Sequence, residues 1–428
     1  MNDPTIRSIR GRRVWDSRGR PTVEAEVTLA DGAVGLAIAP AGASKGKREA
    51  HELRDGGASF GGLDVTRAVA NVNGEIAAAL SGMAAADQAE LDRRLIELDG
   101  TPAKTRLGAN ATLAVSMAAA HAMAASRGVP LYRHIGGDAA TLLPMPQIQI
   151  FGGGAHAGRR VDIQDFMIVC PGARDFGQAL AWTAEVYRHA GLLMRERGSH
   201  AGVADEGGWW PDFATNEEAL ATLVAAIERA GYAPGAQVAI ALDIAASDFG
   251  RAGRYALGLE GRVLDTDGLI ELLLGWLDRY PIASIEDPLA EDDPEGFARF
   301  THAAGKRVQI VGDDFLVSDA KLVREAAARG AANAVLLKPN QRGTLSETLA
   351  AWREAQSVGY AGIVSARSGE TEDTTIVHLA IGWGSGQLKV GSFARGERMA
   401  KWNEALRIEE RLGERARFAG AAAFGRSR

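Results

Sequence analysis

The chain has 428 residues, of which 46% are hydrophobic and 24% are charged. These values are typical of a globular protein with two or three domains, or with one large barrel and an added domain, and they exclude a small disulfide-stapled scaffold. The net charge of -6 argues against a nucleic-acid partner or a polybasic membrane surface, so we expect a small ligand. The single cysteine, Cys170, excludes a disulfide framework and a multi-cysteine metal site.

The first residues lack the apolar stretch of a secretion signal, and we find no uninterrupted apolar run of about 18 residues. We therefore expect a cytoplasmic protein with no membrane partner. Glycine is the one unusual residue type, with 52 copies in 428 residues, about 12% against an average near 7%. This excess has no repeat that would indicate a fibre, so it suggests many tight turns and loops close to a ligand.

Residues 1–137 predict a separate α+β domain. Apolar and polar residues alternate over 23–29, then Asp31 and Gly32 precede a second apolar segment at 34–38. This pattern predicts a β-hairpin with a two-residue turn. From about residue 62 to residue 127 the pattern is helical and rich in alanine.

Residues 138–428 predict a βα barrel. Short apolar runs end in charged residues and are separated by helical stretches, two of which begin with a capping box at Thr215 and Thr344. Apolar strands between helices indicate a parallel sheet buried on both faces, and their spacing over about 290 residues favours a closed barrel. The charged strand ends are Asp243, Glu286, Asp313, Lys338 and Arg367.

Three acids at successive strand ends predict a metal site. The carboxyl ends of barrel strands meet at one mouth, so we expect the carboxylates of Asp243, Glu286 and Asp313 to lie within a few ångströms of one another. Three unpaired anions would repel, and a divalent cation removes that repulsion. All-oxygen ligands favour Mg²⁺ or Mn²⁺ over zinc. The alternative is that each acid caps a helix or pairs with a surface base.

Two lysines are expected near the same mouth. Lys338 ends the next strand, and Lys389 lies in the later segment 386–391. A partly desolvated lysine beside another cation has a lowered pKa, which suits a general base, whereas an ordinary solvated lysine is the alternative. A lysine base beside metal-holding carboxylates suits removal of a proton from the carbon next to a carboxylate.

The chain resembles the enolase family over nearly its whole length. Several long matching segments in the same order are more specific than any one motif. The resemblance implies an N-terminal α+β domain that caps a C-terminal barrel, two Mg²⁺ ions per active site, and reversible dehydration of 2-phosphoglycerate to phosphoenolpyruvate. The matching segments are 16–19 (DSRG), 42–44 (GAS), 153–158 (GGAHAG), 205–208 (DEGG), 241–247 (ALDIAAS), 285–288 (IEDP), 312–314 (GDD), 368–373 (SGETED), 386–389 (GQLK) and 407–410 (RIEE).

The resemblance also implies roles for the metal-side residues. Asp243, Glu286 and Asp313 would hold the tighter Mg²⁺. Ser44, in a glycine-bearing loop, would bind the second Mg²⁺, which arrives with the substrate. Lys338 would remove the C2 proton.

Further roles concern the substrate and the leaving group. By resemblance, Glu206 helps hydroxide leave from C3 and works with the carboxylate of Asp165, while His156 lies on a loop that closes over the substrate. The substrate-binding residues implied are Lys389 and Gln164, with Lys389 at the carboxylate, and Arg367 and Ser368 at the phosphate. The guanidinium group of an arginine matches a phosphate dianion, which supports that assignment.

Some positions in the expected site depart from the family pattern. Enolases carry a histidine where this chain has Ala366 and a glutamate where it has Asp165. Because a small displacement at the reacting atoms costs about 100-fold in rate, the leaving-group side is expected to be altered. If so, Ala366→His with Asp165→Glu raises enolase activity. Residues that also differ and that would add positive charge near the mouth are Lys45, Arg159 and Arg342.

Three functions follow from these observations. Enolase activity comes first, in glycolysis or in a secondary pathway. The second is an enolase-like lyase for another phosphorylated or phosphonate three-carbon acid, similar to carboxyphosphonoenolpyruvate synthase. The third is a non-catalytic binding or scaffold protein, against which the retained metal ligands and lysines argue. The resemblance also implies a homodimer or a larger homo-oligomer.

Overall fold

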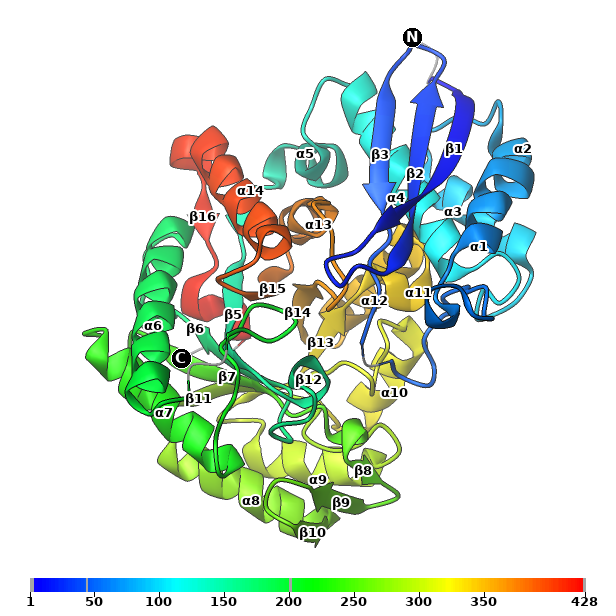
Figure 1. Cartoon of the computed structure of the whole chain (residues 1–428). Coiled ribbons are helices and arrows are strands. Elements are labelled where there is room, and N and C mark those ends of the chain that lie inside the picture. Colours follow the sequence, from blue (N-terminus) through cyan, green and yellow to red (C-terminus); the bar gives the residue numbers. More distant parts are fainter. Residues whose placement is uncertain (1–3, 44, 200–201, 426–428) are drawn as a thin grey trace.

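The computed structural model describes residues 4–43, 45–199 and 202–425. An antiparallel sheet with helices forms the N-terminal part, and a closed eight-stranded barrel ringed by helices forms the rest (Figure 1). The fold class predicted from the sequence is therefore confirmed. None of the helices in these described ranges combines the length and the apolar content needed to cross a membrane.

The chain opens with a three-stranded antiparallel sheet, in the order β1 (Ile6–Trp15), β2 (Pro21–Leu29) and β3 (Val34–Ile38). The predicted hairpin is present between β2 and β3, but its turn is longer than the two residues expected. The amide of Leu29 donates to the carbonyl of Ala33 at 2.8 Å, so residues 30–32 form a three-residue turn.

Alanine-rich helices cover one face of this sheet. α4 packs directly on β2 and β3, and the two backbones approach closely. A Cβ built on Gly35 of β3 would lie 2.1 Å from the carbonyl oxygen of Ala118, so a side chain there would force the helix away. The helices are α1 (Thr66–Asn71), α2 (Ala77–Leu80), α3 (Gln88–Asp99), α4 (Ala109–Ser126) and α5 (Leu131–Gly136), with a π-helical turn at Val72–Ile76.

Eight strands close the barrel in the order β11–β12–β13–β14–β15–β5–β6–β7. All neighbouring pairs are parallel except those of β6, which runs antiparallel to both β5 and β7. The expectation of a wholly parallel sheet is therefore wrong at this strand. The strands are β5 (Met145–Gly152), β6 (Asp165–Val169), β7 (Ala239–Asp243), β11 (Ile282–Glu286), β12 (Gln309–Gly312), β13 (Ala334–Leu337), β14 (Ala361–Ser365) and β15 (Gly386–Ser392).

The reversal of β6 follows from its short connection to β5. A parallel return needs a crossover, usually an α-helix, whereas residues 153–164 hold only the 3₁₀ turn Gly154–Ala157. Because β6 is reversed, its first residue, Asp165, lies at the same mouth as the last residues of the other strands and pairs with Asp243.

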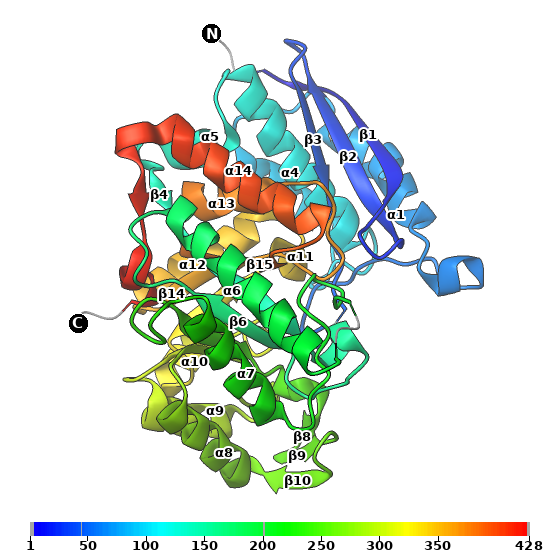
Figure 2. The same cartoon turned by 60° about the vertical axis from the view of Figure 1, so that its left-hand side comes forward.

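Helices surround the barrel. Figure 2 shows α6, α7 and α14 along one side of it, with α6 in contact with both of the others. The outer helices are α6 (Phe176–Glu196), α7 (Asn216–Arg229), α8 (Thr266–Arg279), α9 (Pro294–Ala304), α10 (Ala320–Arg329), α11 (Pro339–Arg342), α12 (Leu345–Ser357), α13 (Thr375–Trp383) and α14 (Gly396–Leu412). Short strands complete the chain: β4 (Leu142–Leu143) with β16 (Arg417–Phe418), and β8 (Gly250–Arg251) with β9 (Arg254–Leu257) and β10 (Arg262–Asp265).

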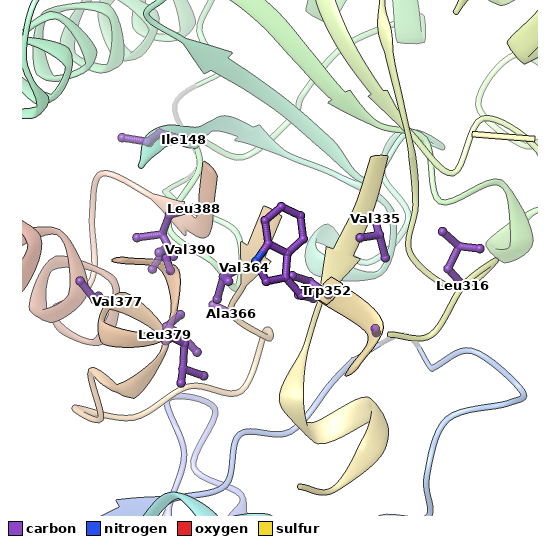
Figure 3. Close-up of a cluster of buried hydrophobic side chains, with 14 of the residues drawn as sticks. Ile148, Leu316, Val335, Trp352, Val364, Ala366, Val377, Leu379, Leu388 and Val390 are labelled. Carbon is purple, nitrogen blue, oxygen red and sulfur yellow. The ribbon is translucent and has the colours of Figure 1, made fainter. Parts of the chain in front are cut away.

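The main hydrophobic core lies between the strands and the outer helices. Figure 3 shows strand residues such as Val335, Val364 and Leu388 beside Trp352 of α12 and Val377 of α13. Both predicted capping boxes supply N-caps, because Thr215 accepts the amide of Glu218 at 3.1 Å and Thr344 accepts that of Glu347 at 3.3 Å. The two capped helices pack on the barrel strands, α7 on β6 and α12 on β13 and β14.

Candidate active site

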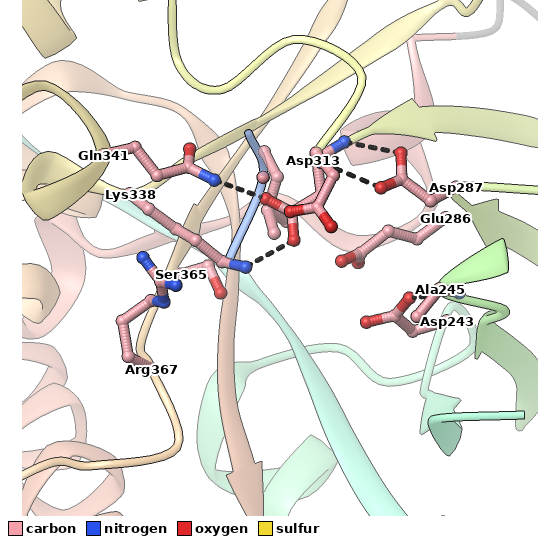
Figure 4. Close-up of polar contacts among 12 residues, drawn as sticks. Asp243, Ala245, Glu286, Asp287, Asp313, Lys338, Gln341, Ser365 and Arg367 are labelled. Atoms are coloured by element: carbon pink, nitrogen blue, oxygen red, sulfur yellow. Dashed lines mark hydrogen bonds and ion pairs between the residues drawn. The ribbon is translucent and has the colours of Figure 1, made fainter. Parts of the chain in front are cut away.

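Three acids stand at the barrel mouth where the sequence placed them. Asp243 ends β7, Glu286 ends β11 beside it, and Asp313 directly follows β12 (Figure 4). Each of the three is at most 4% exposed. Burial of three acids at neighbouring strand ends excludes the alternative that they are solvated helix caps.

The three carboxylates do not gather into one cluster, contrary to expectation, because lysine ammonium groups lie between them. Lys389 Nζ is 2.8 Å from both Asp243 Oδ2 and Glu286 Oε2, and Lys338 Nζ pairs with Asp313 Oδ2. Within the described ranges, the groups whose ligand atoms all lie within 4.8 Å of one another are two different trios. These trios are His156, Asp165 and Glu206, and Asp287, Asp313 and Asp314.

The donor set fits a divalent cation in both charge and chemistry. Glu286 Oε1 is buried and has no hydrogen-bond partner among the described residues. Burial, and then the nearby charge of Asp243, raise the pKa of Glu286 well above its usual value. An unpartnered carboxylate oxygen beside two further acids is an oxygen-rich, anionic environment, which Mg²⁺ or Mn²⁺ favours.

Neither lysine has the lowered pKa that the sequence suggested. Burial opposes the charged form of Lys338, but the adjacent Asp313 outweighs it and the pKa of Lys338 is raised. Lys389 behaves in the same way, since Asp243 and Glu286 raise its pKa well above the usual value despite its burial. The expectation failed because it considered burial and like charges and omitted direct ion pairs with the acids.

A second group of titratable side chains lines the same pocket and meets the first where Asp165 Oδ2 lies 3.4 Å from Lys389 Nζ. His156 Nε2 is 3.7 Å from Glu206 Oε1 and 3.9 Å from Asp165 Oδ1. Burial opposes the charge on Glu206, but His156, Arg398 and the two lysines lower the pKa of this carboxyl group below its usual value. The pocket therefore has carboxylates and an imidazole facing the lysines.

The predicted phosphate-binding residues are paired within the protein. Arg367 Nη1 lies 3.1 Å from Glu49 Oε2 and donates to Asn340 Oδ1 at 3.0 Å, and Arg367 Nη2 donates to Glu49 Oε1 at 3.3 Å. Ser368 Oγ accepts from Arg18 Nη1 at 3.1 Å. Glu49 is thus paired with the guanidinium group that the resemblance assigns to phosphate binding.

One pocket connects most of these side chains and encloses about 330 Å³, including solvent at its entrance. Glu286 and Asp313 are not among its lining residues, and Ser44 lies outside the described part of the chain. The lining residues are Ala43, His156, Gln164, Asp165, Glu206, Asp243, Lys338, Ser365, Ala366, Arg367, Ser368, Lys389, Val390 and Gly391.

The three basic residues suggested for the mouth do not line this pocket. Lys45 pairs with Glu52, and Arg159 donates to the carbonyl of Asp248 at 3.0 Å. Arg342 Nη1 lies 2.8 Å from Asp319 Oδ2. Each of the three side chains thus has another partner, and their positive charge near the mouth stays a prediction.

Other site residues went unassigned in the sequence. Asp287 accepts the amides of Asp313 at 2.9 Å and Asp314 at 2.8 Å, and Gln341 donates to Asp313 Oδ1 at 2.8 Å (Figure 4). Asp287 and Asp314 lie next to predicted ligands in the segments IEDP and GDD, which was an available signal. Glu49 gave no such signal, because its partner Arg367 is 318 residues away.

Comparison with known proteins agrees with this arrangement. The family model for the enolase N-terminal domain matches residues 6–135, and that for the enolase C-terminal TIM barrel domain matches residues 140–427. An enolase of Rubrobacter xylanophilus is 51% identical over 420 residues, which cover 98% of each chain. The chain belongs to the enolase family of carbon–oxygen lyases.

Proposed function

We propose that the protein catalyses the reversible dehydration of 2-phosphoglycerate to phosphoenolpyruvate. The observation that carries this proposal is that Lys338 and Glu206 line one buried pocket. In the forward direction Lys338 takes the proton from C2 and the C3–O bond breaks. The electron pair of the C2–H bond becomes the C2=C3 double bond, and the hydroxide leaves as water after it gains a proton from the Glu206 side.

Lys338 acts as a base only when its amine is neutral. Its ion pair with Asp313 favours the ammonium form, so that pair must be broken before the proton at C2 can be accepted. Gln341, which also donates to Asp313, keeps this carboxylate partnered when Lys338 leaves it. Lys338 can thus act as the base once its ion pair with Asp313 is broken.

We propose that Asp243, Glu286 and Asp313 hold one Mg²⁺, and that Ser44 contributes to a second. Bound there, the cation would stabilise the negative charge that develops on the substrate carboxylate as the C2 proton leaves. The unpartnered Glu286 Oε1 supports this assignment. Lys389, 2.8 Å from both Asp243 and Glu286, is placed to bind the same carboxylate, with Gln164 beside it.

The leaving hydroxide is assigned to the trio of His156, Asp165 and Glu206. The pKa of Glu206 lies below its usual value, so this carboxyl group alone holds a proton weakly at neutral pH. His156 Nε2 lies 3.7 Å from Glu206 Oε1, so the imidazole could supply the proton in place of Glu206. Asp165 Oδ1 lies 3.9 Å from the same imidazole nitrogen and completes the trio.

The proposal extends to the phosphate and to the protein's setting. Arg367 and Ser368 bind the phosphate, which displaces Glu49 from the guanidinium group. We further propose a cytoplasmic homo-oligomer that serves glycolysis, with a domain boundary at residues 137/138.

A second substrate is favoured by one observation. Ala366 lines the pocket between Ser365 and Arg367, at the position where enolases carry a histidine, so a methyl group replaces an imidazole there. The alternative is therefore a lyase for a different phosphorylated or phosphonate three-carbon acid. The two differ in one respect: with 2-phosphoglycerate, the alternative would exchange the C2 proton with solvent but form no phosphoenolpyruvate.

The assay is the appearance of phosphoenolpyruvate absorbance from 2-phosphoglycerate with Mg²⁺. We expect turnover that EDTA abolishes, and a fall in kcat of about 1,000-fold in Lys338→Ala, because a general base contributes on that order. The matched control is Lys321→Ala, which removes an exposed lysine from α10 and should leave kcat unchanged.

Two results would contradict the proposal. Equal kcat values for Lys338→Ala and the wild type would show that Lys338 is not the general base. No phosphoenolpyruvate from the wild type, together with exchange of the C2 proton in deuterated solvent, would identify the alternative substrate class.

A further inference from the structure

Gln149 of β5 contacts the acid side of the pocket without lining it. Its Nε2 donates to Asp165 Oδ1, and its Oε1 accepts the amide of Gly208 at 2.9 Å. Gln149 is fully buried and Asp165 is 1% exposed. The glutamine amide therefore ties β6 to the loop that carries Glu206, two residues before Gly208.

The orientation of this amide is determined by its partners. A backbone N–H can only donate, so the oxygen of Gln149 must face Gly208 and the nitrogen must face Asp165. Asp165 Oδ1 therefore accepts from Gln149, while Asp165 Oδ2 lies 3.4 Å from Lys389 Nζ.

Two glycines make room for the long side chain of Gln149. A Cβ built on Gly208 would lie 2.5 Å from Gln149 Oε1, and one on Gly152 would lie 3.1 Å from the same oxygen. The amide is closely approached by the backbone at these two glycines and is hydrogen-bonded to Asp165. A longer side chain at position 149 or 165 therefore needs a shorter one at the other position.

We propose that Gln149 is a positioning residue whose length is matched to that of Asp165, so that the pair fixes the distance between the carboxylates of Asp165 and Glu206. This rests on the proposed function only in that those carboxylates serve the leaving group. It also gives an expectation for Asp165→Glu without Ala366→His. Asp165→Glu alone adds a methylene against Gln149, so it lowers activity instead of raising it.

The test exchanges one methylene between the two side chains. The variants are Gln149→Asn, Asp165→Glu and the double variant Gln149→Asn/Asp165→Glu, in which the summed length is restored. We expect each single variant to lower kcat by about 100-fold, with KM for 2-phosphoglycerate changed much less, because the fault is in geometry at the reacting atoms. The double variant should recover to within about tenfold of the wild-type kcat.

The matched control is Gln147→Asn. Gln147 lies two residues earlier on β5, is equally buried at 1% exposure, and donates to Gln387 at 2.9 Å inside the barrel. The Gln147→Asn substitution shortens a buried glutamine that is on the same strand but does not line the pocket. The kcat per folded molecule should therefore stay at the wild-type value. A loss of kcat there as large as in Gln149→Asn would overturn the proposal.

Melting temperatures of the same proteins, measured without substrate, separate this proposal from the proposed function. If the length match holds, both single variants melt below the wild type and the double variant melts above at least one of them. If the melting temperatures follow this order but no protein turns over 2-phosphoglycerate, the proposed function is refuted and the length match between Gln149 and Asp165 is supported. If the double variant loses kcat or melting temperature by the sum of the two single losses, the proposed length match between Gln149 and Asp165 is overturned.

Discussion

The buried cations of the candidate site form ion pairs with buried acids. Lys389 is held by two acids at 2.8 Å, and Arg367 is held by Glu49 at 3.1 Å. Breaking one partner of such a buried pair leaves an uncompensated charge, which costs several kcal/mol. Under the proposed function, the carboxylate and phosphate of the substrate would replace these partners.

A buried histidine outside the pocket makes stability depend on pH. His378 is 7% exposed and stacks on Tyr132 with 6.0 Å between ring centroids. Burial, and then the nearby His121, lower the pKa of His378 to about 4, while Glu404 and Asp373 oppose this and Arg411 adds to it. The histidine is therefore neutral in the folded protein at neutral pH.

The sign of this effect follows from proton binding. An unfolded histidine titrates near 6.5, so between about pH 6.5 and 4 the unfolded chain binds more protons, and stability is lost as pH falls through this range. The lost contribution approaches about 3 kcal/mol. We expect His378→Phe to lose less stability than the wild type over this range in denaturant titrations. Equal losses in the two proteins would contradict the assignment.

At the scale of elements, the direction of β6 determines the composition of the site. In a parallel orientation its first residue, Asp165, would lie at the far end of the barrel. The short connection from β5 reverses the strand, so Asp165 pairs with Asp243 and lies 3.9 Å from His156. One strand reversal therefore brings a carboxylate to the acid side of the pocket.

N-caps are the local signals that begin the outer helices. Thr215 is exposed and its hydroxyl accepts the Glu218 amide at 3.1 Å at the start of α7. Thr215→Ala should lower the free energy of unfolding by about 1 kcal/mol, since the amide loses its partner. Thr215→Ser, which keeps the hydroxyl, is the control and should lose less. Indistinguishable unfolding curves for the alanine and serine variants would argue against the cap.

At the scale of the whole molecule, the N-terminal part is docked on the barrel by buried polar contacts. Lys104, only 1% exposed, lies 2.8 Å from Glu347 of α12. Thr112 of α4 donates to the carbonyl of Gly343 at 2.8 Å, and Asp92 of α3 accepts from Ser346 Oγ at 2.6 Å. These contacts position the N-terminal loop that brings Ala43 and Glu49 to the pocket.

This docking can be tested through its buried lysine. Lys104→Met removes the buried cation from Glu347, which keeps Arg342 Nη2 at 3.7 Å, so we expect a loss of about 2 kcal/mol in the free energy of unfolding. Arg93→Met, on the exposed face of α3, removes a solvated partner of Glu90 and Glu97 and should leave the melting temperature nearly unchanged. A larger effect for Arg93→Met than for Lys104→Met would show that the buried pair does not hold the two parts together.

The sequence predicted the fold class and most of the candidate site. Apolar runs that end in Asp243, Glu286 and Lys338 reveal strand ends, because burial on both faces of a strand is a local property of the chain. Capping boxes at Thr215 and Thr344 are equally local. The roles of the site residues remain predictions, and they came from the resemblance to enolases.

Tertiary structure alone decided the partners. Lys389 contacts Asp243, which is 146 residues away in the sequence. Gln149 of β5 contacts Asp165 of the neighbouring β6, the strand whose direction the sequence predicted wrongly. Such contacts set the direction of each lysine pKa shift and the length match on the acid side. The physical reason is that periodicity reports how one segment is buried, whereas the charge beside a side chain depends on which distant segment packs against it.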